Sequence, residues 1–80
     1  MMAYDSDRID EMVLALLCLT MHEEYGTVRA WKGHDWDVLD RLYQKGWIFD
    51  PKNKAKSVVF TEEGRVRAEQ LFETHFRKPV

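Results

Sequence analysis

Histidines beside carboxylates are the residues of this chain whose chemistry first suggests a metal site. His22 is followed by two glutamates, His34 is followed by an aspartate, and His75 lies near the C-terminal end. Zinc-binding helices carry H-E-x-x-H, but the run H-E-E-Y-G lacks the second histidine. Zinc cages also use several cysteines, and this chain has one. We therefore expect no metal site and no cofactor.

Nucleophilic catalysis would need a serine or cysteine paired with a base. Cys18 lies inside the apolar run MVLALLCLTM, residues 12–21, where burial raises the pKa of a thiol and makes it unreactive. Ser6 and Ser57 have no motif around them. We expect the protein not to be an enzyme.

Binding chemistry is better represented, because three tryptophans occur within seventeen residues. Trp31, Trp36 and Trp47 either fill the core or form a partly exposed aromatic patch of the kind that marks a protein interface or a ligand groove. The sequence leaves both readings open. With Leu14 and Met21 of the first apolar segment, they form the candidate interface.

Nucleic-acid binding is the alternative, because residues 26–60 carry seven basic side chains against four acidic ones. The candidate phosphate contacts are Arg41, Lys52, Lys54 and Lys56. Against them, Asp37 and Asp40 occupy outward positions of a helix that would have to enter a phosphate-lined groove. Nucleic acid is therefore a possible partner but not the favoured one.

Composition sets the frame for these side chains. With 80 residues, 45% of them hydrophobic and 32% charged, the chain is expected to form one globular domain, residues 1–80. The apolar run 12–21 has about half of the ~20 residues needed to span a membrane, and acidic residues precede it. We expect a cytoplasmic protein with no membrane partner, and one unpaired cysteine fits that compartment.

A first helix is predicted over residues 7–22, capped by Asp5 or Ser6. Asp10 and its acidic neighbours lie in its first turns, where the helix dipole favours negative charge. Its apolar residues extend around most of the helix, which is typical of a central core helix or of one that forms a dimer.

The remaining elements are predicted from the residues that typically begin or end helices and strands. Residues 27–32, between two glycines, are either a short helix or an ordered loop. A helix is predicted over 36–45, with Asp35 as its cap and Gly46 as a left-handed stop. A β-hairpin follows over 47–60, with strands 47–49 and 57–60 around the turn D-P-K-N-K. Thr61 caps a last helix that Pro79 forbids from continuing.

Two stretches carry a resemblance to known proteins. L-D-R-L-Y-Q-K-G-W-I, residues 39–48, and V-V-F-T-E-E-G, residues 58–64, resemble the recognition helix, wing and exit helix of bacterial winged-helix regulators of the multiple-antibiotic-resistance and phenolic-acid regulator types. R-A-W-K-G-H-D-W-D-V-L-D-R-L, residues 29–42, is similar to a family of small bacterial proteins with no known activity. The first resemblance implies a fold; the acids at the start of the helix depart from its DNA-reading pattern.

These observations predict an α+β fold, a compact winged-helix-like domain of three or four helices with one two-stranded β-hairpin. The favoured function is a non-catalytic protein-interaction or dimerisation module, a homodimer through the first helix, the last helix, or both. The alternative is a DNA-binding transcription regulator that contacts phosphates through the basic hairpin.

Overall fold

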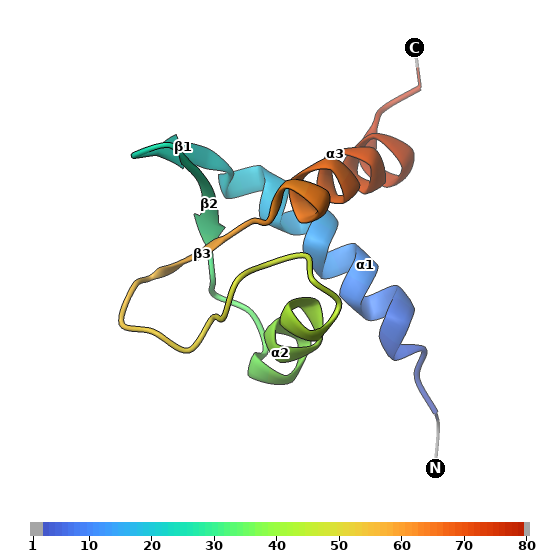
Figure 1. Cartoon of the computed structure of the whole chain (residues 1–80). Coiled ribbons are helices and arrows are strands. Elements are labelled where there is room, and N and C mark those ends of the chain that lie inside the picture. Colours follow the sequence, from blue (N-terminus) through green and yellow to red (C-terminus); the bar gives the residue numbers. More distant parts are fainter. Residues whose placement is uncertain (1–2, 80) are drawn as a thin grey trace.

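The computed structural model describes residues 3–79 and has an α+β fold, as predicted (Figure 1). The elements in chain order are α1 (Ser6–Leu17), the 3₁₀ turn η1 (Cys18–Thr20), β1 (His22–Glu24), β2 (Thr27–Trp31), α2 (Trp36–Gln44), β3 (Ser57–Val59) and α3 (Glu62–Phe76). Three helices pack with a three-stranded antiparallel sheet, an arrangement broadly consistent with a small winged-helix-like domain.

Helix α1 begins where the sequence predicts, because the Asp5 side chain accepts a hydrogen bond from the Arg8 backbone N–H (3.0 Å). It ends earlier than residue 22. The chain tightens into η1, and Met21 then adopts an extended conformation that leads into β1. The apolar run is therefore shared between a helix and the turn that delivers the chain to the sheet.

Residues 27–31 form the central strand of the sheet, so the expected short helix or loop at 27–32 is wrong. Tyr25 and Gly26 both have positive φ (50° and 78°), which matches the two-residue turn that joins antiparallel strands. The β-branched Thr27 and Val28 favour a strand, and Ala30 faces the core with no exposed surface. The sequence does not predict this turn, because its first position holds a tyrosine in place of the Asn, Asp or Gly that is typical there.

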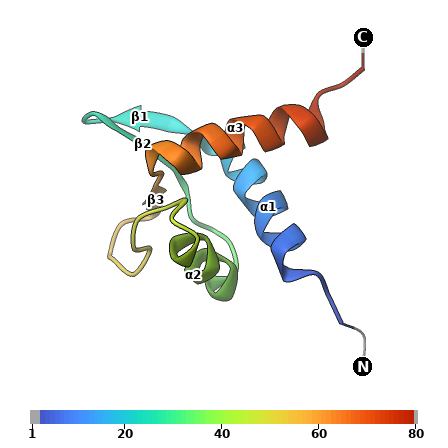
Figure 2. The same cartoon turned by 45° about the vertical axis from the view of Figure 1, so that its right-hand side comes forward.

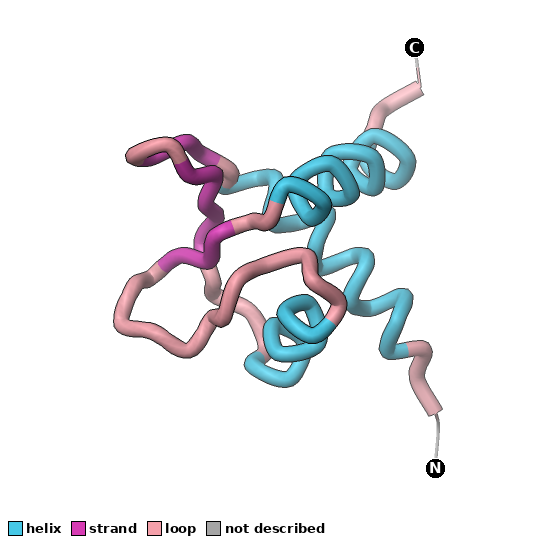
Figure 3. Tube along the Cα trace, in the orientation of Figure 1, coloured by secondary structure: helices cyan, strands magenta, loops and turns pink. Residues whose placement is uncertain are grey.

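The sheet order β1-β2-β3 also changes the predicted hairpin. Strand β3 pairs with β2, with Arg29 opposite Val59. Of the expected first strand, Ile48 forms a single bridge with Phe60, and the Phe49 N–H donates to the Val59 carbonyl (2.9 Å). Residues 49–56 form a long loop (Figure 3). The sheet therefore has three strands in place of one two-stranded hairpin, because β2 supplies the partner that the sequence assigned to 47–49.

The core lies between α1, α2, α3 and the sheet. Its fully buried side chains include Leu14, Leu17, Leu39, Leu42, Ile48 and Val58. Helix α1 packs most extensively against α3, and the two cross each other (Figure 2). An ion pair between Glu11 and Arg67 (3.8 Å) adds to this contact. Among the residues that the structure describes, no helix is long and apolar enough to cross a membrane.

The end of α2 is a Schellman stop, as the sequence predicts. Gly46 has φ 79°, its N–H donates to the Tyr43 carbonyl (2.9 Å), and the Trp47 N–H donates to the Leu42 carbonyl (3.0 Å). Two otherwise unpaired carbonyl groups of the last helical turn are thereby satisfied.

The start of α3 is joined directly to that stop. The Thr61 N–H donates to the Trp47 carbonyl (3.1 Å), and the Thr61 hydroxyl donates to the Gly46 carbonyl (2.6 Å). The same hydroxyl oxygen caps α3 by accepting from the Gly64 N–H (2.9 Å). A Cβ at position 64 would overlap the Trp47 carbonyl group. Residues 46–47 and 61–64 therefore connect the end of α2 to the start of α3 through close backbone contacts.

Replacing Gly64 with alanine is expected to lower the free energy of unfolding by roughly 3 kcal/mol, because the added methyl group meets backbone that cannot rotate away. Urea denaturation measures the change. The control is Glu63→Ala, on the exposed side of the same turn, with an expected loss of about 0.5 kcal/mol. Equal effects of the two variants would contradict the close approach.

Candidate functional site

A buried carboxylate joins the first two helices. Asp10 has no exposed surface. Its two oxygens accept hydrogen bonds from Arg41 Nε (both 2.9 Å), and one of them lies 2.8 Å from Arg41 Nη2. Lys45 Nζ donates to the other oxygen (2.9 Å) and also pairs with the exposed Asp7 (2.8 Å). From the sequence, Asp10 was expected to interact favourably with the helix dipole. In the structure its main role is to bind Arg41 and Lys45 at α2.

The electrostatics of this cluster favour the charged state of all three groups. Burial alone would raise the pKa of the Asp10 carboxyl, but the hydrogen bonds and charges of Arg41 and Lys45 outweigh burial and lower it. The pKa of Arg41 is raised by its hydrogen bonds to Asp10. Burial opposes the charge on Lys45, yet its bonds to Asp7 and Asp10 raise its pKa. The cluster therefore acts as a structural cross-link.

Helix α1 presents a second apolar face, on the side away from this cluster. Ile9, Met12, Leu16 and Leu19 follow one another at spacings of three, four and three residues. Ile9, Leu16 and Leu19 are 40%, 38% and 68% exposed, and Met12 is half-buried. We call these four residues the α1 stripe. Tyr4, Asp5, Arg8 and Val13 line a shallow groove with its first two members.

The five candidate interface residues predicted from the sequence differ in how far they are exposed. Leu14 is completely buried among the core residues, so it offers no surface to a partner. Met21 is half-buried against the core. Trp31 and Trp36 are each 54% exposed, whereas Trp47 is half-buried.

The three tryptophans lie in different surroundings. The Trp31 indole covers Gly33, where a Cβ would come within 2.7 Å of its Nε1. Trp36 opens α2 beneath the ammonium group of Lys32, whose Nζ is 5.5 Å from the ring centroid. Trp47 packs on the core at the other end of α2. Trp47 therefore contributes to the core, whereas Trp31 and Trp36 are partly exposed.

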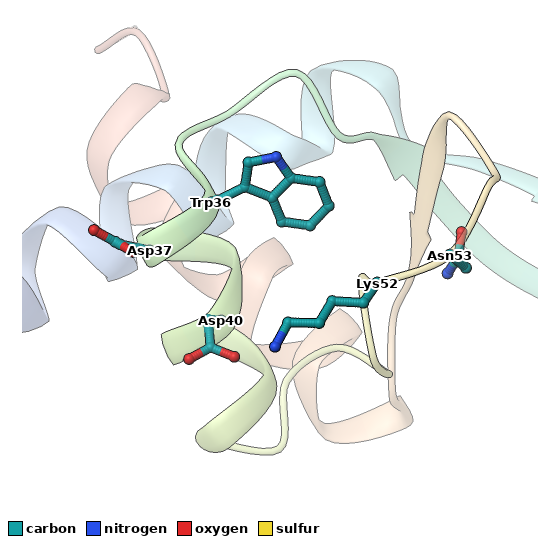
Figure 4. Close-up of a pocket in the computed structure, with 5 residues that line it drawn as sticks. All are labelled: Trp36, Asp37, Asp40, Lys52 and Asn53. Carbon is teal, nitrogen blue, oxygen red and sulfur yellow. The ribbon is translucent and has the colours of Figure 1, made fainter.

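A pocket of about 630 Å³ lies between α2 and the loop 49–56 (Figure 4). It is lined by Trp36, Asp37, Asp40, Lys52 and Asn53. Lys32 fixes the loop against the helix, because its Nζ donates to the Pro51 carbonyl (2.9 Å) and to the Asn53 carbonyl (3.1 Å). Spacing along the chain gave no sign of this pocket, because its two walls lie on segments that only the fold brings together.

The candidate phosphate contacts do not form one group. Arg41 is engaged by Asp10, which leaves it poorly placed for a phosphate. Lys52 lines the pocket beside two aspartates, and Lys54 and Lys56 are exposed farther along the loop. Helix α2 is capped by Asp35, whose side chain accepts from the Asp37 N–H (3.1 Å), as predicted.

The described residues do not bring together the side chains that a metal site needs. Within residues 3–79, no group of three or more His, Cys, Asp and Glu side chains could bind a metal ion. Cys18 is half-buried, and burial, with a smaller contribution from Glu69, raises the pKa of its thiol.

The fold and these surfaces define a small α+β domain whose exposed features are an apolar helix face and a charged, tryptophan-lined pocket. The chain belongs to the family described as domain of unknown function DUF6429, which matches residues 5–78. It is 52% identical over 77 residues to the uncharacterized protein y4hR of Sinorhizobium fredii, an alignment that covers 96% of this chain and all of the relative. No solved structure gives a significant match.

Replacing Asp10 with asparagine is expected to lower the free energy of unfolding at pH 7 by roughly 3 kcal/mol, because it removes the buried partner of two cations. Asp7→Asn, which removes the exposed partner of Lys45, is the matched control, with an expected loss below about 1 kcal/mol. Chemical denaturation distinguishes them, and a mild effect at Asp10 would contradict the cross-link.

The wild type and Asp10→Asn also test how the stabilisation by Asp10 depends on pH. The pKa of Asp10 is lowered in the folded state, so its stabilisation is complete above the ordinary aspartate pKa of about 3.9 and is lost as the pH falls through the lower folded value. The stability gap between the wild type and Asp10→Asn should therefore be constant from pH 7 to pH 5 and shrink at pH 3. Urea denaturation at these pH values measures it, and a gap that stays constant would show that Asp10 titrates normally.

Proposed function

We propose that this protein is a non-catalytic, cytosolic interaction module that forms a homodimer through the α1 stripe. The carrying observation is the exposure of Ile9, Leu16 and Leu19 on a helix whose opposite side is already buried. A helix at the surface of a monomer normally keeps one polar face. Here both faces are apolar, and no element within residues 3–79 covers the outer one.

The spacing of the stripe fits another helix of the same kind. Ile9, Met12 and Leu16 of α1 have the spacing of the two apolar positions of a heptad, which pack against an identical seam on a neighbouring helix. Leu19 continues the spacing from the 3₁₀ turn η1. A second copy of this chain supplies that seam. A two-fold axis would use the same patch on both copies, which is the commonest geometry of homodimers.

The charges around the stripe are acidic at both ends. Asp5 and Asp7 are exposed at its N-terminal end, and Glu23 and Glu24 are exposed beyond its C-terminal end. Both a parallel and an antiparallel pair would therefore bring acidic side chains together, so charge does not set the orientation of the two copies.

One residue of the sequence-based interface adjoins the stripe. The Trp31 backbone N–H donates to the Thr20 hydroxyl (2.9 Å), immediately after Leu19. Its half-exposed indole is an aromatic group of the type enriched in the centre of interfaces. We include Trp31 in the proposed dimer surface.

A DNA-binding regulator is less well supported. It depends on Lys52, Lys54 and Lys56, with Arg41 engaged elsewhere. Asp37 and Asp40 lie on the pocket beside Lys52, where they would oppose the approach of a phosphate backbone.

Sedimentation equilibrium tests the dimer. The wild-type chain is expected to sediment as a dimer at tens of micromolar, and Leu16→Glu to sediment as a monomer with an unchanged circular-dichroism spectrum. Val66→Glu is the matched control, because Val66 is 40% exposed, close to the 38% of Leu16, but lies on α3 outside the stripe.

A monomeric wild type at these concentrations would overturn the proposal. So would a loss of the dimer in Val66→Glu equal to that in Leu16→Glu.

A further inference from the structure

The pocket between α2 and the loop 49–56 lies outside the α1 stripe and has no part in the proposed dimer. It is a wide, open depression of about 630 Å³ that would cover a ligand from one side. Its lining combines an indole, carboxylates and an ammonium group, a combination that suits a small ligand with both polar and apolar parts.

The loop wall of the pocket is held in place before any ligand binds. Asp50 accepts from the Lys52 N–H (2.9 Å), and Asn53 accepts from the Ala55 N–H (2.8 Å) through its side chain. Pro51 is buried, and Lys32 binds two carbonyl groups of the loop from below. A wall fixed in this way loses little conformational freedom on binding.

Two charges of opposite sign face this space without partners. Asp40 is half-buried on α2 and Lys52 is exposed on the loop. In the described part of the chain, neither side chain takes part in an ion pair, whereas Arg41, Lys45 and Arg65 are all paired. Figure 4 shows the Lys52 chain extending across the pocket toward α2, while Asp37 points away from it.

The apolar surface of the pocket is the indole of Trp36. It is 54% exposed although Lys32 lies 5.5 Å from its centre. An exposed indole offers a flat contact for an aromatic or branched apolar group.

We infer that this pocket binds a small zwitterion of the amino-acid type with an apolar side chain. The ammonium group of the ligand pairs with the Asp40 carboxylate, its carboxylate pairs with Lys52, and its side chain packs on Trp36. Each charge of the ligand then meets one uncompensated charge of the protein, and charge-assisted hydrogen bonds are the strong polar contacts available to it.

The test uses the ¹⁵N-labelled full chain and three probes: L-phenylalanine, 2-phenylethylamine, which lacks the carboxylate, and 3-phenylpropanoate, which lacks the ammonium group. The indole N–H signals of the three tryptophans are followed by NMR during titration, and the Trp36 signal is identified with Trp36→Phe. L-Phenylalanine is expected to move that signal saturably and to bind about tenfold more tightly than either analogue, since each lost contact is a charge-assisted one.

Single-charge variants assign the two contacts. Asp40→Asn should reduce the affinity for L-phenylalanine to that for 3-phenylpropanoate, and Lys52→Gln should reduce it to that for 2-phenylethylamine. Lys54→Gln, an exposed lysine of the same loop that does not line the pocket, should leave the affinity unchanged.

Absence of a saturable shift of the Trp36 signal with L-phenylalanine would overturn the inference. So would equal affinity for L-phenylalanine and either analogue, which would identify a site for simple amines or simple anions. Because none of the residues that line the pocket belongs to the α1 stripe, a failure of dimerisation does not affect this result.

Discussion

The carboxylate of Asp10 fixes how α1 sits in the molecule. A buried charge must be paired, and its partners Arg41 and Lys45 lie one turn apart on α2. The pairing sets both the position of α1 and its rotation about its own axis. Once Asp10 and Leu14 point inward, Ile9 and Leu16 must point outward. The apolar outer face therefore follows from an ionic contact on the inner one.

A second constraint, made of backbone, positions α2 and α3. The Trp47 carbonyl receives the Thr61 N–H, and Gly64 lies against it without a side chain. Lys32 adds a third connection by binding the loop 49–56 to the start of α2. The pocket and the stripe thus lie on different parts of one framework, in which α1, the end of α2 and the start of α3 each contact a segment distant in sequence.

The sequence predicts well those features that depend only on a few neighbouring residues. The caps Asp5 and Thr61 and the stop at Gly46 are local hydrogen-bonding devices, and each is where its residue type indicates. What it missed depends on distant partners. The role of Asp10 needs cations 31 and 35 residues away, and the strand at 27–31 needs β3 as a neighbour. The pocket also depends on distant partners, since Lys32 binds the loop 49–56 from the segment before α2.

The packing of α1 against α3 bears on how the protein is made. These helices come from opposite ends of the chain, yet they form the most extensive helix contact. During synthesis α1 emerges before α3, and the part of its inner face that packs on α3 stays uncovered until α3 has been translated. Throughout that interval apolar side chains are exposed on two faces of α1. The growing chain is thus most prone to aggregation, and to pairing with a neighbouring nascent copy, before α3 is complete.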